Sequence, residues 1–141
     1  MLYQPKHYKA YQIVDAATYS KFGEQSLQFF RNEALEMLDQ FHELFNAPIL
    51  VNNWKQDGQF QWRGLRTVDF PGGAKWSAHR VGAAFDFNVT GLTPSQVAAT
   101  ILQNQAKIPH CRRMEDPTKT KGWTHCDVIE TGIGSILIIQ P

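Results

Sequence analysis

The chain has 141 residues and a formal net charge of +1, from 14 basic and 13 acidic side chains. This length suits one domain that buries its core without disulfide support, so we expect a single domain over residues 1–141. Because basic and acidic residues are nearly equal in number, the charge gives no reason to expect nucleic-acid binding. No apolar run approaches the length needed to insert into a membrane.

The first predicted element is a helix from about Glu24 to Phe45. Its apolar residues recur at three- and four-residue steps, which is typical of a helix packed on a sheet. These residues are Leu27, Phe30, Ala34, Leu35, Leu38, Phe41 and Phe45. The segment Asn46-Ala47-Pro48 ends the helix, and the apolar run from Ile49 to Val51 is predicted to be a buried strand.

The next segment, from Asn52 to Gly73, is rich in glycine and lacks clear periodicity. We predict a long loop that borders the functional site. From Ala84 to Val89 the residues alternate, with Phe85 and Phe87 on one side and Asp86 on the other. This alternation predicts a half-buried strand.

A second helix is predicted to start at Thr93 and to run to about Ala106. The run Thr93-Pro94-Ser95-Gln96 combines an N-cap, a proline at the first helical position and a capping-box glutamine. Three further strands, near His110 to Met114, Trp123 to Val128 and Ile136 to Ile139, would complete an antiparallel sheet. The sequence therefore predicts the α+β class, with an antiparallel sheet and helices packed on one side.

Two short segments, residues 77–86 and 123–127, hold the most informative side chains. The first contains His79 and Asp86, and the second contains His125. Two imidazoles and one carboxylate are a ligand set for catalytic zinc, which keeps a fourth coordination position for water. Strand alternation turns Asp86 away from the core and lets His125 point into the same cleft.

Gly82 lies between the first two candidate ligands, where we expect the chain to turn or to pass close to another backbone. Such a turn would bring His79 and Asp86 together, although seven positions separate them. Asp127 shares a strand face with His125. We expect Asp127 to orient that histidine rather than to act as a base.

The pattern Ser-x-His-x-x-Gly-x-Ala-x-Asp is formed by Ser77, His79, Gly82, Ala84 and Asp86, and an aromatic-x-His-x-Asp strand is formed by Trp123, His125 and Asp127. Together the two motifs resemble the zinc D,D-peptidase family. This family includes D-alanyl-D-alanine carboxypeptidases, murein endopeptidases and phage endolysins, and it shares its fold with the signalling domain of hedgehog proteins. The resemblance covers roughly Ile49 to Val128. It implies a hedgehog/D,D-peptidase-like fold in which His79, Asp86 and His125 hold zinc.

One position departs from the family pattern. Much of the family has an acidic general base three residues before the last histidine ligand, and here that position is Gly122. A branch of murein endopeptidases similarly carries Gly-aromatic-x-His-x-Asp. The candidate bases are Glu115 and Asp116, which precede a 117–122 loop that can fold back over the metal, and Asp127. A base must lie within hydrogen-bond reach of the attacking water, so the sequence leaves all three open.

The site also needs a cation to hold a developing oxyanion or a substrate carboxylate. The family often supplies an arginine from the glycine-bearing loop, and both Arg63 and Arg66 qualify, with a slight preference for Arg63. Ser77 and Trp123 flank the candidate ligands and are further candidates for substrate binding. Amphipathic aromatic side chains beside polar groups suit the recognition of an extended peptide.

The spacing of the candidate ligands predicts a metallohydrolase, and the resemblance implies that it is a zinc metallopeptidase. Its substrate would be an amide bond in peptidoglycan stem peptides or cross-links, cut by a monomeric enzyme of the D,D-carboxypeptidase or endopeptidase (endolysin) type. One alternative is a catalytically inactive, zinc-bearing module of the same fold that binds the cell wall or belongs to a virion. Another is a metal-free fold in which the motif residues form a hydrogen-bonded core cluster.

The first residues, Met1 to Lys6, contain no apolar core of a signal peptide. We therefore expect accumulation in the cytoplasm with release to the cell wall by a separate route, as for phage lysins, or association with a virion. Cys111 and Cys126 lack the paired spacing of a zinc knuckle or a redox motif, and we expect both to be reduced and buried.

Overall fold

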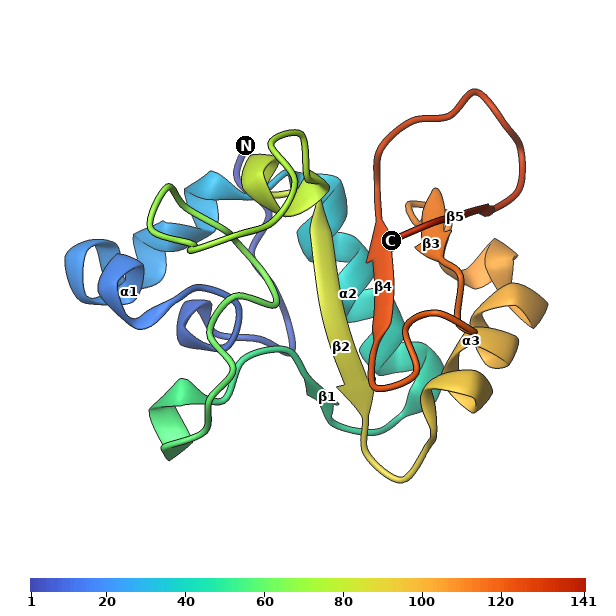
Figure 1. The fold of residues 1–141 in the computed structure, drawn as a ribbon, viewed down its shortest axis with the longest axis horizontal. Helices are drawn as coiled ribbons and strands as arrows, with labels where there is room; N and C mark the ends of the chain where they lie inside the picture. Colours follow the sequence, from blue (N-terminus) through green and yellow to red (C-terminus); the bar gives the residue numbers. More distant parts are fainter.

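The computed structural model describes residues 1–141, which form three α-helices and one five-stranded sheet (Figure 1). The helices are α1 (Ala16–Phe22), α2 (Asn32–Phe45) and α3 (Pro94–Gln103). The strands are β1 (Ile49–Leu50), β2 (Ala84–Val89), β3 (Arg113–Glu115), β4 (Thr124–Asp127) and β5 (Leu137–Ile139). Short 3₁₀ helices cover Ala10–Gln12, Gly23–Phe29, Trp54–Gln56, Ala78–Val81 and Gln105–Lys107. The mixed α+β class is as predicted.

The strands are ordered β1-β2-β4-β3-β5 across the sheet. Neighbouring strands are antiparallel except β3 and β5, which pair in parallel with Arg113 opposite Leu137. The prediction of a wholly antiparallel sheet is therefore wrong at this edge. β5 runs antiparallel to β4, which precedes it in the chain, but β3 lies between the two strands, and β5 is consequently parallel to β3.

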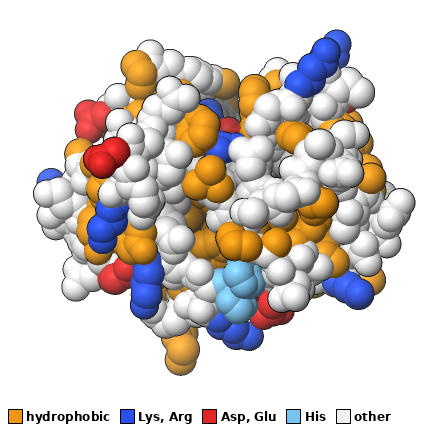
Figure 2. Space-filling model, turned by 90° about the horizontal axis from the view of Figure 1, so that it is seen from below, with side chains coloured by type: hydrophobic (Ala, Val, Ile, Leu, Met, Phe, Trp, Pro, Cys, Tyr) orange, Lys and Arg blue, Asp and Glu red, His pale blue; other side chains and the backbone are white.

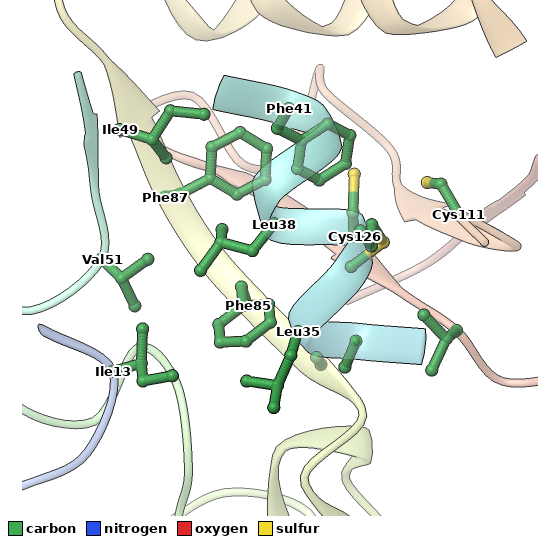
Figure 3. Packing of buried hydrophobic residues seen from close by; sticks show 14 of the residues in the cluster. Ile13, Leu35, Leu38, Phe41, Ile49, Val51, Phe85, Phe87, Cys111 and Cys126 are labelled. Atoms are coloured by element: carbon green, nitrogen blue, oxygen red, sulfur yellow. The ribbon is translucent and has the colours of Figure 1, made fainter. Parts of the chain in front are cut away.

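The predicted alternation of side chains along β2 is confirmed, and it separates the core from the opposite face of the sheet. The prediction that the strand is half-buried is wrong, because five of its six residues are buried. Phe85 and Phe87 are fully buried and stack on Phe30 and Phe41, with ring centroids 5.5 and 4.9 Å apart. Figure 3 shows Phe85 and Phe87 on the side of β2 that faces α2, which carries Phe41. Asp86, between them, projects from the other face of the strand, toward His79 and His125.

The helix predicted from Glu24 to Phe45 is divided in two. Residues 23–29 form a 3₁₀ helix, and Phe30 is extended, with φ −101° and ψ 152°, before α2 begins. The backbone N–H of Arg31 donates to the carbonyl of Gly82 at 3.0 Å. This hydrogen bond to a distant segment and the stacking of Phe30 on Phe85 of β2 explain why the helix is interrupted at Phe30. The spacing of apolar residues within the segment cannot predict such an interruption.

The predicted start of α3 is confirmed, whereas α1 was not predicted. Thr93 caps α3 with the expected capping box to Gln96, and the helix ends at Gln103, three residues earlier than predicted. In α1, the side chain of Asp15 accepts the N–H of Thr18, an ordinary N-cap that is visible in the sequence. α1 packs against the 3₁₀ helices at residues 10–12 and 23–29 and lies beside the sheet (Figure 1).

The surface mixes both signs of charge. Figure 2 shows one face on which basic and acidic side chains are scattered among hydrophobic and uncharged ones, without a field of one sign. None of the helices has the length and apolar character needed to cross a membrane.

Candidate metal centre

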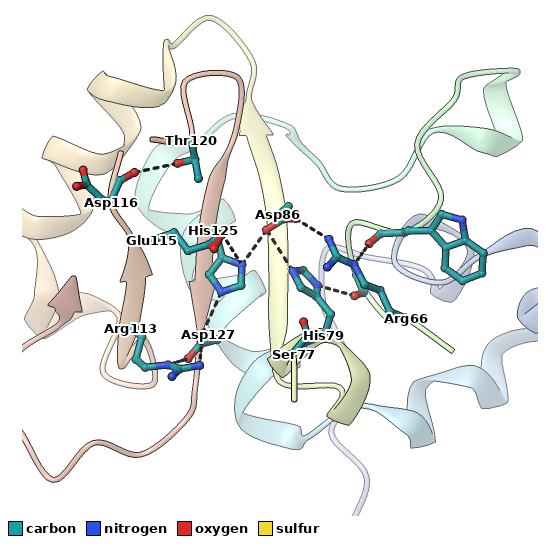
Figure 4. Close-up of polar contacts among 12 residues, drawn as sticks. Arg66, Ser77, His79, Asp86, Arg113, Glu115, Asp116, Thr120, His125 and Asp127 are labelled. Carbon is teal, nitrogen blue, oxygen red and sulfur yellow. Dashed lines mark hydrogen bonds and ion pairs between the residues drawn. The ribbon is translucent and has the colours of Figure 1, made fainter. Parts of the chain in front are cut away.

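Three elements bring the candidate ligands together. In the antiparallel pair of β2 and β4, Asp86 lies directly opposite His125. His79 comes from the 3₁₀ helix Ala78–Val81, which precedes β2 and is capped by Ser77. One donor atom from each of the three residues lies within 4.8 Å of the other two (Figure 4). The site is therefore a group that could bind one metal ion.

Gly82 makes this approach possible, as predicted. It adopts a left-handed conformation, with φ 65°, at the end of the 3₁₀ helix. A Cβ atom at this position would lie 2.1 Å from the carbonyl oxygen of Phe29. Only glycine therefore allows the chain to turn from His79 into β2 while it crosses the segment that leads to α2.

Each imidazole is held by the nitrogen that points away from Asp86. The Nδ1 atom of His79 is 2.8 Å from the carbonyl oxygen of Gly64, and its Nε2 atom is 3.2 Å from Asp86 Oδ1. A carbonyl only accepts, so Nδ1 carries a proton, and Nε2 is the ring nitrogen left to face Asp86. The Nε2 atom of His125 is 3.0 Å from Asp127 Oδ2, and its Nδ1 atom is 2.8 Å from Asp86 Oδ1. Each ring thus presents one ligand nitrogen to the same point.

Asp127 is held in turn by Arg113, a residue that the sequence analysis did not identify. The guanidinium donates from Nε and Nη2 to the two carboxylate oxygens, at 2.8 and 3.0 Å. Asp127 is fully buried, and Arg113 lies opposite it in the β3–β4 register. The orienting role expected of Asp127 agrees with these contacts. The partner could be found only from the strand pairing, because nothing in the sequence links Arg113 to this position.

The polar contacts set the charges of the ligands. Burial by itself would raise the pKa of Asp86, but hydrogen bonds from His125 and His79 hold it well below its ordinary range. Burial opposes a charge on His125, but hydrogen bonds to Asp127 and Asp86 outweigh it and raise the pKa of His125 to about 9. In the ion-free protein an imidazolium therefore supplies positive charge at the place where a cation would bind.

Of the three candidate bases, only Glu115 faces the ligands. Its Oε1 atom lies 3.4 Å from His125 Nδ1, and partial burial raises its pKa, although the charge on His125 opposes that shift. Asp116 is turned away and accepts hydrogen bonds from the N–H and the hydroxyl of Thr118. Both carboxylate oxygens of Asp127 are already occupied. The geometry therefore favours Glu115 and excludes Asp116 from the site.

The ligands open onto a cavity of about 470 Å³. Its lining includes Arg66, Ser77, Arg113, Glu115, Trp123 and Ile139, but no residue of the 117–122 loop, so the expected fold of that loop over the metal is not observed. Of the predicted substrate-binding residues, Arg66, Ser77 and Trp123 thus border the cavity. Ser77 also accepts the backbone N–H of His79 at 3.3 Å.

The preference for Arg63 over Arg66 is wrong on geometric grounds. Arg63 is buried outside the cavity lining and donates to Asn88 at 2.6 Å. Arg66 donates from Nη2 to Asp86 Oδ2 at 3.2 Å and from Nε to the carbonyl of Trp62. The two arginines are three positions apart in an irregular loop, where no periodicity predicts which side chain turns toward the metal ligands.

Arg80 does not line the cavity, but it holds a loop that borders the cavity. Its guanidinium donates to the backbone carbonyls of Thr67, Gly72 and Ala74, at 3.3, 2.9 and 3.3 Å. These bonds hold the loop that brings Lys75 and Trp76 to the cavity, where the Trp76 side chain is almost fully exposed. The sequence analysis did not identify this role of Arg80.

The donor set fits a divalent transition ion, since imidazole nitrogen and carboxylate oxygen are the ligands of three-residue zinc sites. Cys126 is fully buried on the core face of β4, and neither it nor Cys111 is paired in a disulfide. Comparison of the chain with protein-family models, curated proteins and solved structures gives no match. The likeness to the zinc D,D-peptidases therefore rests on the residues of the two motifs.

Proposed function

We propose that this chain is a zinc metallopeptidase of hedgehog/D,D-peptidase-like fold that hydrolyses an amide bond in peptidoglycan stem peptides or cross-links. One observation is its main support. One donor atom each from His79, Asp86 and His125 lies within 4.8 Å of the other two, beside Glu115 and at an open cavity. One chain supplies every ligand, so a monomer would suffice.

The ion, when bound by these three residues, would supply Lewis acidity that acidifies water and polarises an amide carbonyl. Glu115 is the group best placed to accept a proton from the attacking water and to return it to the departing amine. Partial burial raises the pKa of Glu115, which makes it a better proton acceptor than an exposed carboxylate. Arg66, beside Asp86, offers a guanidinium to the negative charge that develops on the carbonyl oxygen.

The substrate class comes from the resemblance, and the cavity is compatible with it. Trp76 and Trp123 border the opening and offer flat apolar surfaces to an extended peptide. We favour a bond that involves a D-amino acid. In this proposal the chain reaches the wall through a separate membrane lesion or with a virion, as phage endolysins do.

Incubation of the zinc-loaded chain with purified peptidoglycan tests the proposal. We expect new amine termini and soluble fragments, whose masses identify the bond, and we expect neither with a His79→Ala variant. Co-sedimentation with sacculi without new amines would instead favour the inactive wall-binding module. Absence of bound metal after exposure to zinc would leave only the hydrogen-bonded cluster.

A further inference from the structure

The two cysteines of the chain, Cys111 and Cys126, have no part in the proposed mechanism. Both are buried, and neither forms a disulfide. Cys111 comes just before β3 and Cys126 lies within β4. The fold brings the two segments together, because β3 pairs with β4 and places Met114 opposite Cys126.

The two thiols are in contact at the β3–β4 edge of the core. The Cys126 side chain makes a hydrogen bond with Cys111. Figure 3 shows the sulfur atom of Cys111 turned toward Cys126. The neighbouring residues are already joined, since the N–H of Arg112 donates to the carbonyl of Asp127 at 2.9 Å. Adjacent strands lie about 4.8 Å apart, within the range of about 4.4–6.8 Å between Cα atoms that a disulfide spans.

Only one of the two thiols can be reached from the surface. Cys111 borders a second cavity, of about 380 Å³, whose lining also includes Pro109, Arg112 and Ser135. Cys126 is fully buried and does not border this cavity. A small oxidant that enters the cavity therefore meets Cys111 first, with Cys126 next to it.

We propose that Cys111 and Cys126 are a redox modification site, which hydrogen peroxide converts into a disulfide within the chain. The Cys111 sulfur attacks one peroxide oxygen, the O–O bond breaks, and the departing hydroxide takes the thiol proton and leaves as water. The Cys126 sulfur then attacks the sulfenic acid so formed. The S–O bond breaks, the S–S bond forms, and a second water carries away the oxygen and the remaining thiol proton. The two thiols lose two electrons, which reduce the peroxide.

The disulfide would constrain the strand that carries the candidate base. It would close a loop over residues 111–126, which contains β3 and Glu115, and it would fix the residue beside His125. Closing this loop restricts the unfolded chain, so the transition temperature should rise by about 5–10 °C. The inference is independent of the proposed peptidase function, because it requires neither a bound metal nor turnover.

Treatment of the reduced native chain with hydrogen peroxide tests the proposal. After the reaction, the chain is unfolded in denaturant and its remaining thiols are alkylated. Mass spectrometry should show a monomer that has lost two hydrogen atoms and carries no alkyl group, and digestion should give a fragment that joins the peptides of Cys111 and Cys126. Thermal unfolding should show the raised transition temperature, and dithiothreitol should reverse both changes.

Substitutions test the order of the two steps. In Cys126→Ala the reaction should stop at a sulfenic acid on Cys111, which dimedone traps. Since a change at a buried cysteine can impair folding, a second pair of variants leaves both cysteines in place. Ser135→Trp, which narrows the cavity beside Cys111, should slow disulfide formation several-fold. Ser95→Trp, on α3 and outside the lining of this cavity, should not.

Three results would overturn the proposal. They are two thiols that survive peroxide in the native chain, a disulfide that joins two chains, and a sulfenic acid that forms first on Cys126. An equal rate of disulfide formation in the wild type and in Ser135→Trp would contradict entry through the cavity.

Discussion

The imidazole of His125 and the carboxylate of Asp127 lie two residues apart on one face of β4, with Nε2 3.0 Å from Oδ2. This bond fixes which ring nitrogen remains free, and it turns Nδ1 toward Asp86. A single strand thus provides a candidate ligand and the group that orients it.

Removal of any one ligand should abolish zinc binding. We expect about one zinc ion per wild-type chain and none in His79→Ala or Asp86→Asn, because two ligands hold the ion poorly. Elemental analysis after dialysis measures this. His110→Ala is the control, since His110 pairs with Glu36 outside the site and its loss should leave the zinc content intact.

The substitution Asp127→Asn should weaken zinc binding by about 10- to 100-fold without removing it. An amide of the same shape keeps the packing but is a weaker acceptor for the N–H of His125, and it no longer neutralises Arg113. Competition with a chromogenic chelator gives the affinity. An unchanged affinity would show that the orientation of His125 does not depend on Asp127.

Loss of the carboxylate at Glu115 should slow hydrolysis while zinc remains bound. For Glu115→Gln we expect turnover of peptidoglycan to fall by about 10²- to 10⁴-fold. Asp116→Asn, one position along the chain but turned toward Thr118, should retain most of the activity. Equal losses in both variants would contradict the assignment of the base.

The raised pKa of His125 predicts two effects of pH. In the ion-free protein the imidazolium stabilises the fold, fully below its ordinary value of 6.5, and this contribution is lost as pH rises through about 9. The same proton competes with zinc, because a ligand imidazole must be neutral. Zinc affinity should therefore fall, by up to about tenfold per unit, as pH decreases below about 9.

Chemical denaturation of the ion-free chain between pH 6 and 10 measures the first effect, and calorimetry in buffers of different ionisation enthalpy measures the protons released by zinc. His125→Gln should remove the pH dependence of stability, and it should abolish zinc binding because it removes a ligand. Zinc binding that weakens as pH rises from 6 to 8 would contradict the assignment.

Gly82→Ala should destabilise the protein by about 2 kcal/mol or more, because a Cβ atom would strain the left-handed backbone and meet the carbonyl of Phe29. Gly122→Ala is the matched control, since a Cβ atom there meets no neighbour within 4 Å, and its effect should stay within about 0.5 kcal/mol. Denaturant midpoints of the two variants and the wild type provide the comparison.

Sequence patterns predicted those features that depend on neighbours along the chain. The alternation around Asp86, the cap at Thr93 and the turn at Gly82 each involve a few consecutive residues, whose backbone preferences are local. The prediction of one continuous helix from Glu24 to Phe45 was wrong because the interruption at Phe30 depends on a contact between distant segments. Its apolar spacing was real, but a hydrogen bond from Arg31 to Gly82 interrupts it.

By itself, the sequence determined which residue types form the candidate site, and strand alternation determined which of them leave the core. Tertiary structure alone decided that Arg66 and not Arg63 borders the cavity, that Glu115 and not Asp116 faces His125, and that Arg113 holds Asp127. The physical reason is that these contacts join distant segments. Their geometry depends on strand register and loop path, which the packing of the whole core sets, whereas a local pattern depends only on its own backbone.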